Sequence, residues 1–386
     1  MKVAIPVLVM VLAGWLLPAS AQQPQWKLVP NTMSDSRWAP AACVLANGKS
    51  AVIVGGYSFA LDSCVPSIDI FDEATGRFRR SRARMTYPRD FAQANLLPNG
   101  DVLISGGFND VWASLDTAEV YDPTTDSCRP AAGKMNQHRE LFQAVNLRNG
   151  QTLLTGGLDL WVRHTVATAE IYDPATDRFT PTKSTMAQDR FGHAACVLAD
   201  GRVLIVGGTH WSLSRKESKV LASAEIYDPS TGLFHTTAGS LDSGRDRPTA
   251  TLLPSGQVLI YGGQGPKGTA VTSAELFDPS TEMFTPIVSP PQGPRMAHCA
   301  LLLPTVGKVL IAGGWDTADS KSPATALVYD PSSNQFQNMP DLPFATLDAA
   351  MLAFPDGTVL YAGGKTAFKQ KSGSSSQGAV IAMIAH

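Results

Sequence analysis

Short apolar runs that end in a pair of glycines recur along the chain at nearly regular intervals. The intervals are 51, 50, 51, 55, 51 and 50 residues, and the pairs begin at Gly55, Gly106, Gly156, Gly207, Gly262, Gly313 and Gly363. A repeat of this length holds four strands and their turns, and it exceeds the repeats of the tetratricopeptide and ankyrin solenoids. The pattern therefore predicts seven copies of one all-β unit.

The fourth repeat illustrates the first half of the unit. A strand at 193–198, apolar after His193, is followed by the turn Asp200-Gly201 and by an apolar run at 203–206. Turn residues of this kind supply the positive φ that tight hairpins need. The second run is apolar at every position, which indicates a strand buried on both faces by neighbouring units.

Two further strands complete each unit. Glu170 and Tyr172 mark the third strand, and Phe179 begins the fourth strand seven positions after the tyrosine. The last repeat ends with a third strand at 378–385, whereas residues 25–29 form a spare strand before the first repeat. Pairing these two segments removes an exposed sheet edge. The sequence thus predicts a seven-bladed β-propeller, with four antiparallel strands per blade, closed by the N-terminal strand.

The repeat resembles that of the Kelch family, whose signature is an apolar strand ending in Gly-Gly, then an aromatic residue and a second large aromatic residue. Gly156, Gly157, Tyr172 and Phe179 carry this signature, although Phe replaces the usual Trp in most repeats. The chain also looks like exported bacterial proteins grouped with the galactose oxidase propeller. This resemblance implies a fold, and fold alone does not transfer function.

The resemblance also suggests two possible enzymatic activities on carbohydrate, those of the copper radical oxidases and of the sialic acid mutarotases. The oxidases would need a Tyr-His pair, which the sequence lacks, and the tyrosines Tyr121, Tyr172, Tyr227 and Tyr329 already serve as repeat aromatics. A sugar mutarotase or epimerase needs only an acid or base near the bound sugar, so it stays open as the alternative function. Relatives of that kind commonly have six blades.

The N-terminus carries the pattern of an export signal. Lys2 precedes an apolar run at 3–17 and the small-residue site Ala19-Ser20-Ala21. This pattern predicts a signal peptide at 1–21, cleaved to leave the propeller at 22–386 in the periplasm or outside the cell. No later apolar stretch has the length of a membrane span, so we expect no membrane association after cleavage.

The charge balance and the motifs exclude several classes of protein. Basic residues number 31 and acidic residues 33, for a net charge of -2, which gives no reason to expect nucleic-acid binding. No Walker loop, Gly-x-Ser-x-Gly elbow, His-Glu-x-x-His or Cys-x-x-Cys motif is present. We therefore expect no cofactor and no bound metal. A monomer is expected, with most of its five cysteines as free thiols.

The loops that follow the glycine pairs concentrate aromatic and histidine side chains. The candidates for ligand binding there are Trp112, Trp161, His164, His210, Trp211 and Trp315. Alternating strand directions place these loops on one face, where their flat rings suit stacking on sugars or docking a protein loop. The alternative is that the rings pack loop against loop.

Opposite charges recur at two fixed positions of the unit. Arginine precedes the first strand in six repeats and an acid starts the third strand in five, as Arg190 and Glu225 do in the fourth. Charges that recur in most units favour structural clamps between strands. If some arginines of this series stay unpaired, they would instead form a positive mouth that grips carboxylates. Arg190 and Arg247 are the arginines among the candidates for the ligand-binding rim.

Three residues break the repetition and are further site candidates. His193, His298 and Asp348 are assigned to the position three after the arginine, with Ala345 in the arginine position of the seventh repeat. Such a set could bind a metal or transfer protons, but its members belong to separate blades, which favours a solvated channel lining. The favoured function is a non-catalytic module that binds a glycan or a protein.

Overall fold

The computed structural model describes residues 25–383 except 112, 291–292, 317–321 and 367–375. The expected signal peptide lies outside these residues. The described chain is all-β and holds eight four-stranded antiparallel sheets and one two-stranded sheet. No helix long and apolar enough to cross a membrane occurs within the described segments.

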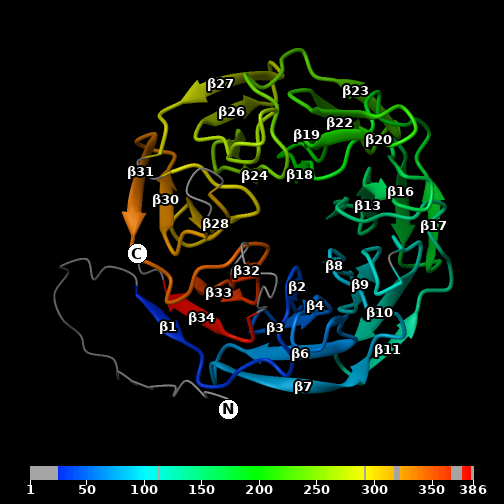
Figure 1. The fold of residues 1–386 in the computed structure, drawn as a ribbon, viewed down its shortest axis with the longest axis vertical. Helices are drawn as coiled ribbons and strands as arrows, with labels where there is room; N and C mark the ends of the chain where they lie inside the picture. Colours follow the sequence, from blue (N-terminus) through cyan, green and yellow to red (C-terminus); the bar gives the residue numbers. More distant parts are fainter. Residues whose placement is uncertain (1–24, 112, 291–292, 317–321, 367–375, 384–386) are drawn as a thin grey trace.

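Seven of the four-stranded sheets are built in the same way, and Figure 1 shows them arranged around a common centre. The innermost strands are β2 (Ala41–Val44), β8 (Gln93–Leu96), β12 (Gln143–Asn146), β18 (Ala194–Val197), β24 (Thr249–Leu252), β28 (Cys299–Leu303) and β32 (Ala350–Ala353). The second strands are β3 (Ser50–Val54), β9 (Val102–Ser105), β13 (Thr152–Thr155), β19 (Val203–Val206), β25 (Val258–Tyr261), β29 (Lys308–Ala312) and β33 (Thr358–Ala362). These are the hairpins that the apolar runs and turns predict.

The outer half of each sheet completes the unit. The third strands are β6 (Ser67–Asp72), β10 (Ala118–Asp122), β16 (Ala169–Asp173), β22 (Ala224–Asp228), β26 (Ala274–Asp278), β30 (Ala326–Asp330) and β34 (Ala379–Met383). The outermost strands are β7 (Arg77–Arg84), β11 (Ser127–Pro130), β17 (Arg178–Pro181), β23 (Leu233–Thr236), β27 (Met283–Ile287), β31 (Gln335–Met339) and β1 (Trp26–Leu28). This all-β architecture is consistent with a Kelch-type β-propeller.

The first strand of the described chain lies in the same sheet as the last. β1 pairs with β34 so that Trp26 lies opposite Ala382 and Leu28 opposite Val380. Figure 1 shows β1 at the outer side of this sheet, beside β34 and β33. The innermost strand β2 contacts β8 on one side and β32 on the other.

The second strands are buried because neighbouring sheets cover both of their faces. In β3, Val52 and Val54 pack in one cluster with Val102 of β9, whereas Ile53 packs in another cluster with Leu360 of β33. The continuous apolar runs therefore have the two-sided burial that their sequence predicts.

In most sheets, a buried arginine clamp joins the segment before the first strand to the rest of the sheet. Arg190 donates from Nη2 to Oε1 of Glu225 at 2.9 Å and from Nη1 to the carbonyl of Gly207 at 2.8 Å. The same ion pairs occur at Arg37–Asp69, Arg89–Glu119, Arg139–Glu170 and Arg245–Glu275. These contacts confirm the clamps expected from the recurring charges.

The register assigned to the seventh repeat is wrong by one residue. The second glycine of each pair donates to the carbonyl of the next clamp arginine, as Gly263 does to Arg295, and Gly314 donates instead to Thr346. Thr346, not Ala345, therefore occupies the arginine position. Asp348 lies two positions after it, where Arg247 lies in the fifth sheet, and not in the position of His193.

Candidate functional site

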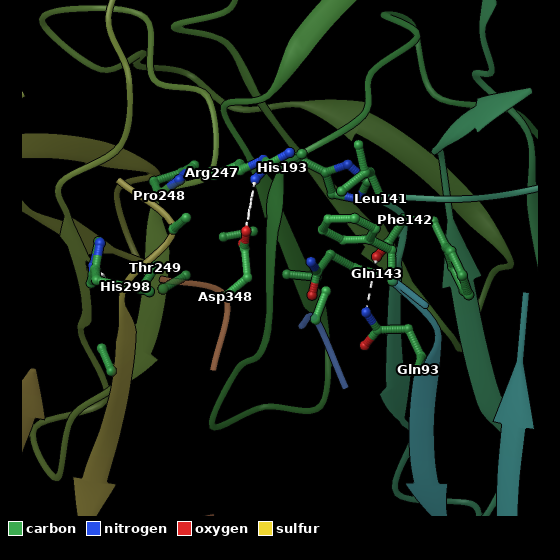
Figure 2. Close-up of a pocket in the computed structure, with 18 of the residues that line it drawn as sticks. Gln93, Leu141, Phe142, Gln143, His193, Arg247, Pro248, Thr249, His298 and Asp348 are labelled. Atoms are coloured by element: carbon green, nitrogen blue, oxygen red, sulfur yellow. Dashed lines mark hydrogen bonds and ion pairs between the residues drawn. The ribbon is translucent and has the colours of Figure 1, made fainter. Parts of the chain in front are cut away.

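The innermost strands surround a central cavity of about 370 Å³. His193, His298, Arg247 and Asp348 line it together with apolar residues and glutamines, and Figure 2 shows Arg247 and His193 above Asp348, with His298 to one side. These four residues lie at the end of the cavity where the chain enters the innermost strands. Four of the candidates from the sequence thus lie around one space.

Seven equivalent residues form a collar at this end of the cavity. They are Ala39, Phe91, Leu141, Gly192, Arg247, Ala297 and Asp348, and all have φ between 47° and 61°. Backbone hydrogen bonds connect five of the seven neighbouring pairs, such as Arg247 N to Gly192 O at 2.7 Å and Asp348 N to Ala297 O at 3.0 Å. A left-handed conformation is uncommon for residues other than glycine, so these bonds hold strained backbone in place.

Side chains of the collar meet across its opening. Arg247 Nη1 lies 3.3 Å from Oδ1 of Asp348, and the Arg247 guanidinium lies 5.6 Å from the centroid of the Phe91 ring. Asp348 also accepts a hydrogen bond from Nε1 of Trp38 at 3.0 Å. Residues from four sheets therefore fix one arginine over the cavity.

Three buried carboxyl groups lie next to the collar. Asp90, Glu140 and Asp246 directly follow the clamp arginines, and each is less than one-tenth exposed. Burial raises the pKa of Asp90 to about 7, that of Glu140 to about 8 and that of Asp246 to about 6, and Arg247 partly opposes the last two shifts. Carboxyls that titrate near neutrality can exchange protons at physiological pH.

Gly192 is the one glycine of the collar, and Asp246 explains why. A Cβ at Gly192 would lie 2.3 Å from Oδ1 of Asp246. The φ of Gly192 is also +61°, a conformation that L side chains rarely adopt. The glycine therefore leaves room for a buried carboxylate in the neighbouring sheet.

The two buried histidines are held in their neutral form. Burial, together with Arg190, lowers the pKa of His193 to about 3, and burial with Arg295 lowers that of His298 to about 3. Their Nε2 atoms lie 2.9 Å and 3.0 Å from the hydroxyls of Thr155 and Thr249. Among the described residues, no three His, Cys, Asp or Glu side chains are placed to hold a metal ion.

Exposed apolar side chains gather on the segments between second and third strands, which we call the loop face. Leu61, Val111, Trp161, Val162 and Leu213 lie there, in four successive sheets, and they are 60%, 75%, 64%, 52% and 45% exposed. Large apolar side chains that cluster at the surface mark interaction sites more often than isolated ones do.

Two loops of this face form a sheet of their own. It contains β14 (Leu158–Asp159), β15 (His164–Thr165), β20 (Thr209–Ser212) and β21 (Glu217–Val220) in that order. The remaining loop strands, β4 (Tyr57–Ser58) and β5 (Ser63–Cys64), pair with each other. Sequence periodicity predicts only loops at these places, because each strand has no more than four residues.

Comparison with known families identifies the repeat. Residues 97–135 and 190–238 match the family model of the Kelch motif. These two matches, which cover less than half of the chain, support a Kelch repeat family. No curated protein matches the chain. The two matched stretches hold β9 to β11 and β18 to β23, so one of them includes the β20–β21 hairpin of the loop face.

The repeat framework buries several of the candidates. Arg190 is 0% exposed and belongs to a clamp, and Trp315 is 7% exposed because it packs with Ala297 and Leu347. His193 and His298 line the cavity but are also buried. Burial in the repeat framework therefore corrects their assignment to an open rim.

The other candidates lie at two places in the structure. Trp161 and His164 are exposed on the β14–β15 hairpin, and His210 and Trp211 are half-buried in β20. Arg247 and Asp348 lie at the collar. Trp112 lies outside the described residues.

The three buried acids are the residues that sequence reasoning missed. Their signal is an acid directly after the clamp arginine in the second, third and fifth repeats, where the other repeats have Trp38, Phe191, Met296 and Leu347. An Arg-Asp or Arg-Glu pair looks like an ordinary exposed ion pair in a sequence. Only its burial distinguishes it.

Proposed function

We propose that this protein is an exported, monomeric, seven-bladed Kelch propeller that binds a partner protein on its loop face and performs no catalysis. The pairing of β1 with β34 and the contact of β2 with β32 support a ring closed by the N-terminal strand. The predicted signal peptide at 1–21 supports export to the periplasm or beyond. Kelch repeats are in general protein-interaction modules.

The observation that carries the proposal is the row of exposed apolar side chains across four loops. Trp161 is the largest of them, and its Nε1 donates to the carbonyl of Ser114 at 3.2 Å. Its ring is therefore held in one orientation before any partner binds, which reduces the entropy lost on binding. Rigid, exposed aromatic side chains are the common anchors of protein interfaces.

Trp161→Ala is expected to weaken binding of the partner by about 30-fold, or about 2 kcal/mol, as for a central anchor residue. The purified protein would be screened against the proteins and glycans of its compartment, and each partner titrated against the variant. Leu233→Ala is the matched control, since Leu233 is 47% exposed but lies on the outer strand β23. Glycans captured in place of proteins, or equal loss in both variants, would refute the proposal.

A sugar mutarotase is the second candidate, and the near-neutral pKa values of Asp90 and Glu140 favour it. General acid–base catalysis works best when the pKa of the group is near the working pH. Under the binding proposal, the protein leaves the rate at which freshly dissolved sialic acid reaches its anomeric equilibrium unchanged, as followed in proton spectra. A faster approach that Glu140→Gln abolishes would instead establish the enzyme.

A further inference from the structure

The hairpins β14–β15 and β20–β21 form one rigid platform on the loop face. Their tips are joined by a hydrogen bond from Leu213 N to Arg163 O at 3.1 Å. Behind the tips, the Thr165 hydroxyl contacts both the carbonyl and the amide nitrogen of Trp211, at 3.2 Å each. We call residues 158–165 and 209–220 the paired hairpins. Two loops from successive repeats thus act as a single surface.

The tips of the paired hairpins present apolar side chains beside each other. Trp161 and Val162 are exposed on one tip and Leu213 on the other. The Trp161 ring lies 5.8 Å from that of His138, centre to centre, in addition to its bond to Ser114. The platform therefore offers a fixed apolar anchor point.

The same tips carry an excess of positive charge on a chain whose net charge is -2. Arg163, Arg215, Lys216 and Lys219 are exposed, and Glu217 is the one exposed acid on the paired hairpins. Glu217 lies 3.5 Å from His210. The local charge attracts a negatively charged ligand, and the exposed side chains make that attraction sensitive to salt.

The acidic side chains beneath the platform, Asp159 and Asp189, form hydrogen bonds with neighbouring polar side chains. Asp159 accepts from Nε2 of Gln137 at 2.5 Å, and Asp189 accepts from the Thr165 hydroxyl at 2.6 Å and contacts Nδ1 of His210 at 2.7 Å. Both carboxylates thus face inward, toward polar partners. The outward charge of the tips comes from the arginine and lysine side chains.

The outer strand of the platform adds a third feature. β21 is at the edge of its sheet, and Glu217, Ser218 and Lys219 on it are exposed. An edge strand can pair with an extended segment of another chain, while nearby side chains decide which segment fits. A strand-like peptide uses this edge, whereas a membrane surface does not.

We infer that the paired hairpins are the docking site for an extended, acidic segment of a partner protein that carries a large apolar side chain. The apolar side chain of the segment packs against Trp161 and Leu213, its carboxylates face the basic tips, and its backbone lies along β21. The inference rests on the proposed function and specifies the chemistry of the partner.

A displayed library of random peptides, panned on the whole protein, tests the inference. We expect enrichment of peptides that combine aspartate or glutamate with an aromatic or large aliphatic residue. The double variant Arg215→Glu/Lys216→Glu should weaken binding of a selected synthetic peptide at least about tenfold, with a smaller salt dependence. Lys267→Glu, an exposed charge reversal on the loop of the fifth sheet, should change binding less than about twofold.

The outcomes separate this inference from the proposed function. Enrichment of neutral or basic peptides, or equal effects of the two charge reversals, overturns the acidic-segment inference and leaves loop-face binding in place. Binding to phosphatidylserine vesicles but to no peptide overturns the inference in favour of a membrane surface. Capture of no peptide, protein or vesicle overturns both.

Discussion

Glu225→Ala is expected to lower the free energy of unfolding by about 3–5 kcal/mol, because it leaves the Arg190 guanidinium buried without its counter-charge. Both side chains are at most 1% exposed, and their charged atoms are 2.9 Å apart. Glu225 also accepts hydrogen bonds from the backbone amides of Ala187 and Gln188. In the variant these two amides lose their acceptor. Urea denaturation followed by circular dichroism measures the change.

Two matched variants isolate the cause. Arg129→Ala breaks the exposed ion pair with Asp177, whose arginine is 57% exposed, and should cost less than about 1 kcal/mol. Arg190→Met/Glu225→Leu replaces the buried pair with apolar side chains and should recover most of the stability lost in Glu225→Ala. The sixth sheet already places Leu327 where the other clamps have an acid. A cost for Glu225→Ala similar to that for Arg129→Ala would contradict the clamp.

Raising the pH from 6.5 to 8 is expected to lower the free energy of unfolding by roughly 1–2 kcal/mol, because two buried carboxyls lose roughly 2–3 kcal/mol and two buried histidines return less than about 1 kcal/mol. The pKa of Asp90 is raised to about 7 and that of Glu140 to about 8, mainly by burial. Their ordinary pKa is near 4. In this pH range both carboxyls are ionised in the unfolded chain, whereas in the folded chain they are still partly protonated. The stability that Asp90 and Glu140 contribute is therefore complete below about pH 4. It is lost as the pH rises through their pKa values in the folded protein.

The pH window and the variants make this expectation specific. The pKa of an unfolded histidine is about 6.5, so the unfolded chain still binds protons on His193 and His298 at the low end of the window. As the pH rises to 8 these two histidines together add less than about 1 kcal/mol of stability, which opposes the decline. Asp90→Asn/Glu140→Gln should therefore abolish the decline. Asp246→Asn should leave it unchanged, because the pKa of Asp246 is about 6. Denaturant midpoints at several pH values measure the slopes, and a flat wild-type profile would show that the two carboxyls are already ionised.

The sequence predicted the strands because the information that defines them is local. Each hairpin follows from an apolar run, a turn such as Asp200-Gly201 and a glycine pair. The clamps followed in the same way, since arginine and an acid recur at fixed positions and have charges that must be matched when buried. The alignment of the seventh repeat was wrong by one residue because Thr346, in the arginine position, has no charge that marks the repeat.

The character of the site was decided by burial, which depends on segments far apart in the chain. Trp161 and Trp315 both follow a glycine pair, yet one is 64% exposed and the other packs under its neighbours. Asp90 and Glu140 look like surface acids until the sheets enclose them and raise their pKa values. The sequence by itself determined the repeats, the strands and the clamps. Only the tertiary structure decided which side chains reach solvent, because solvent exposure is set by neighbours that come from other repeats.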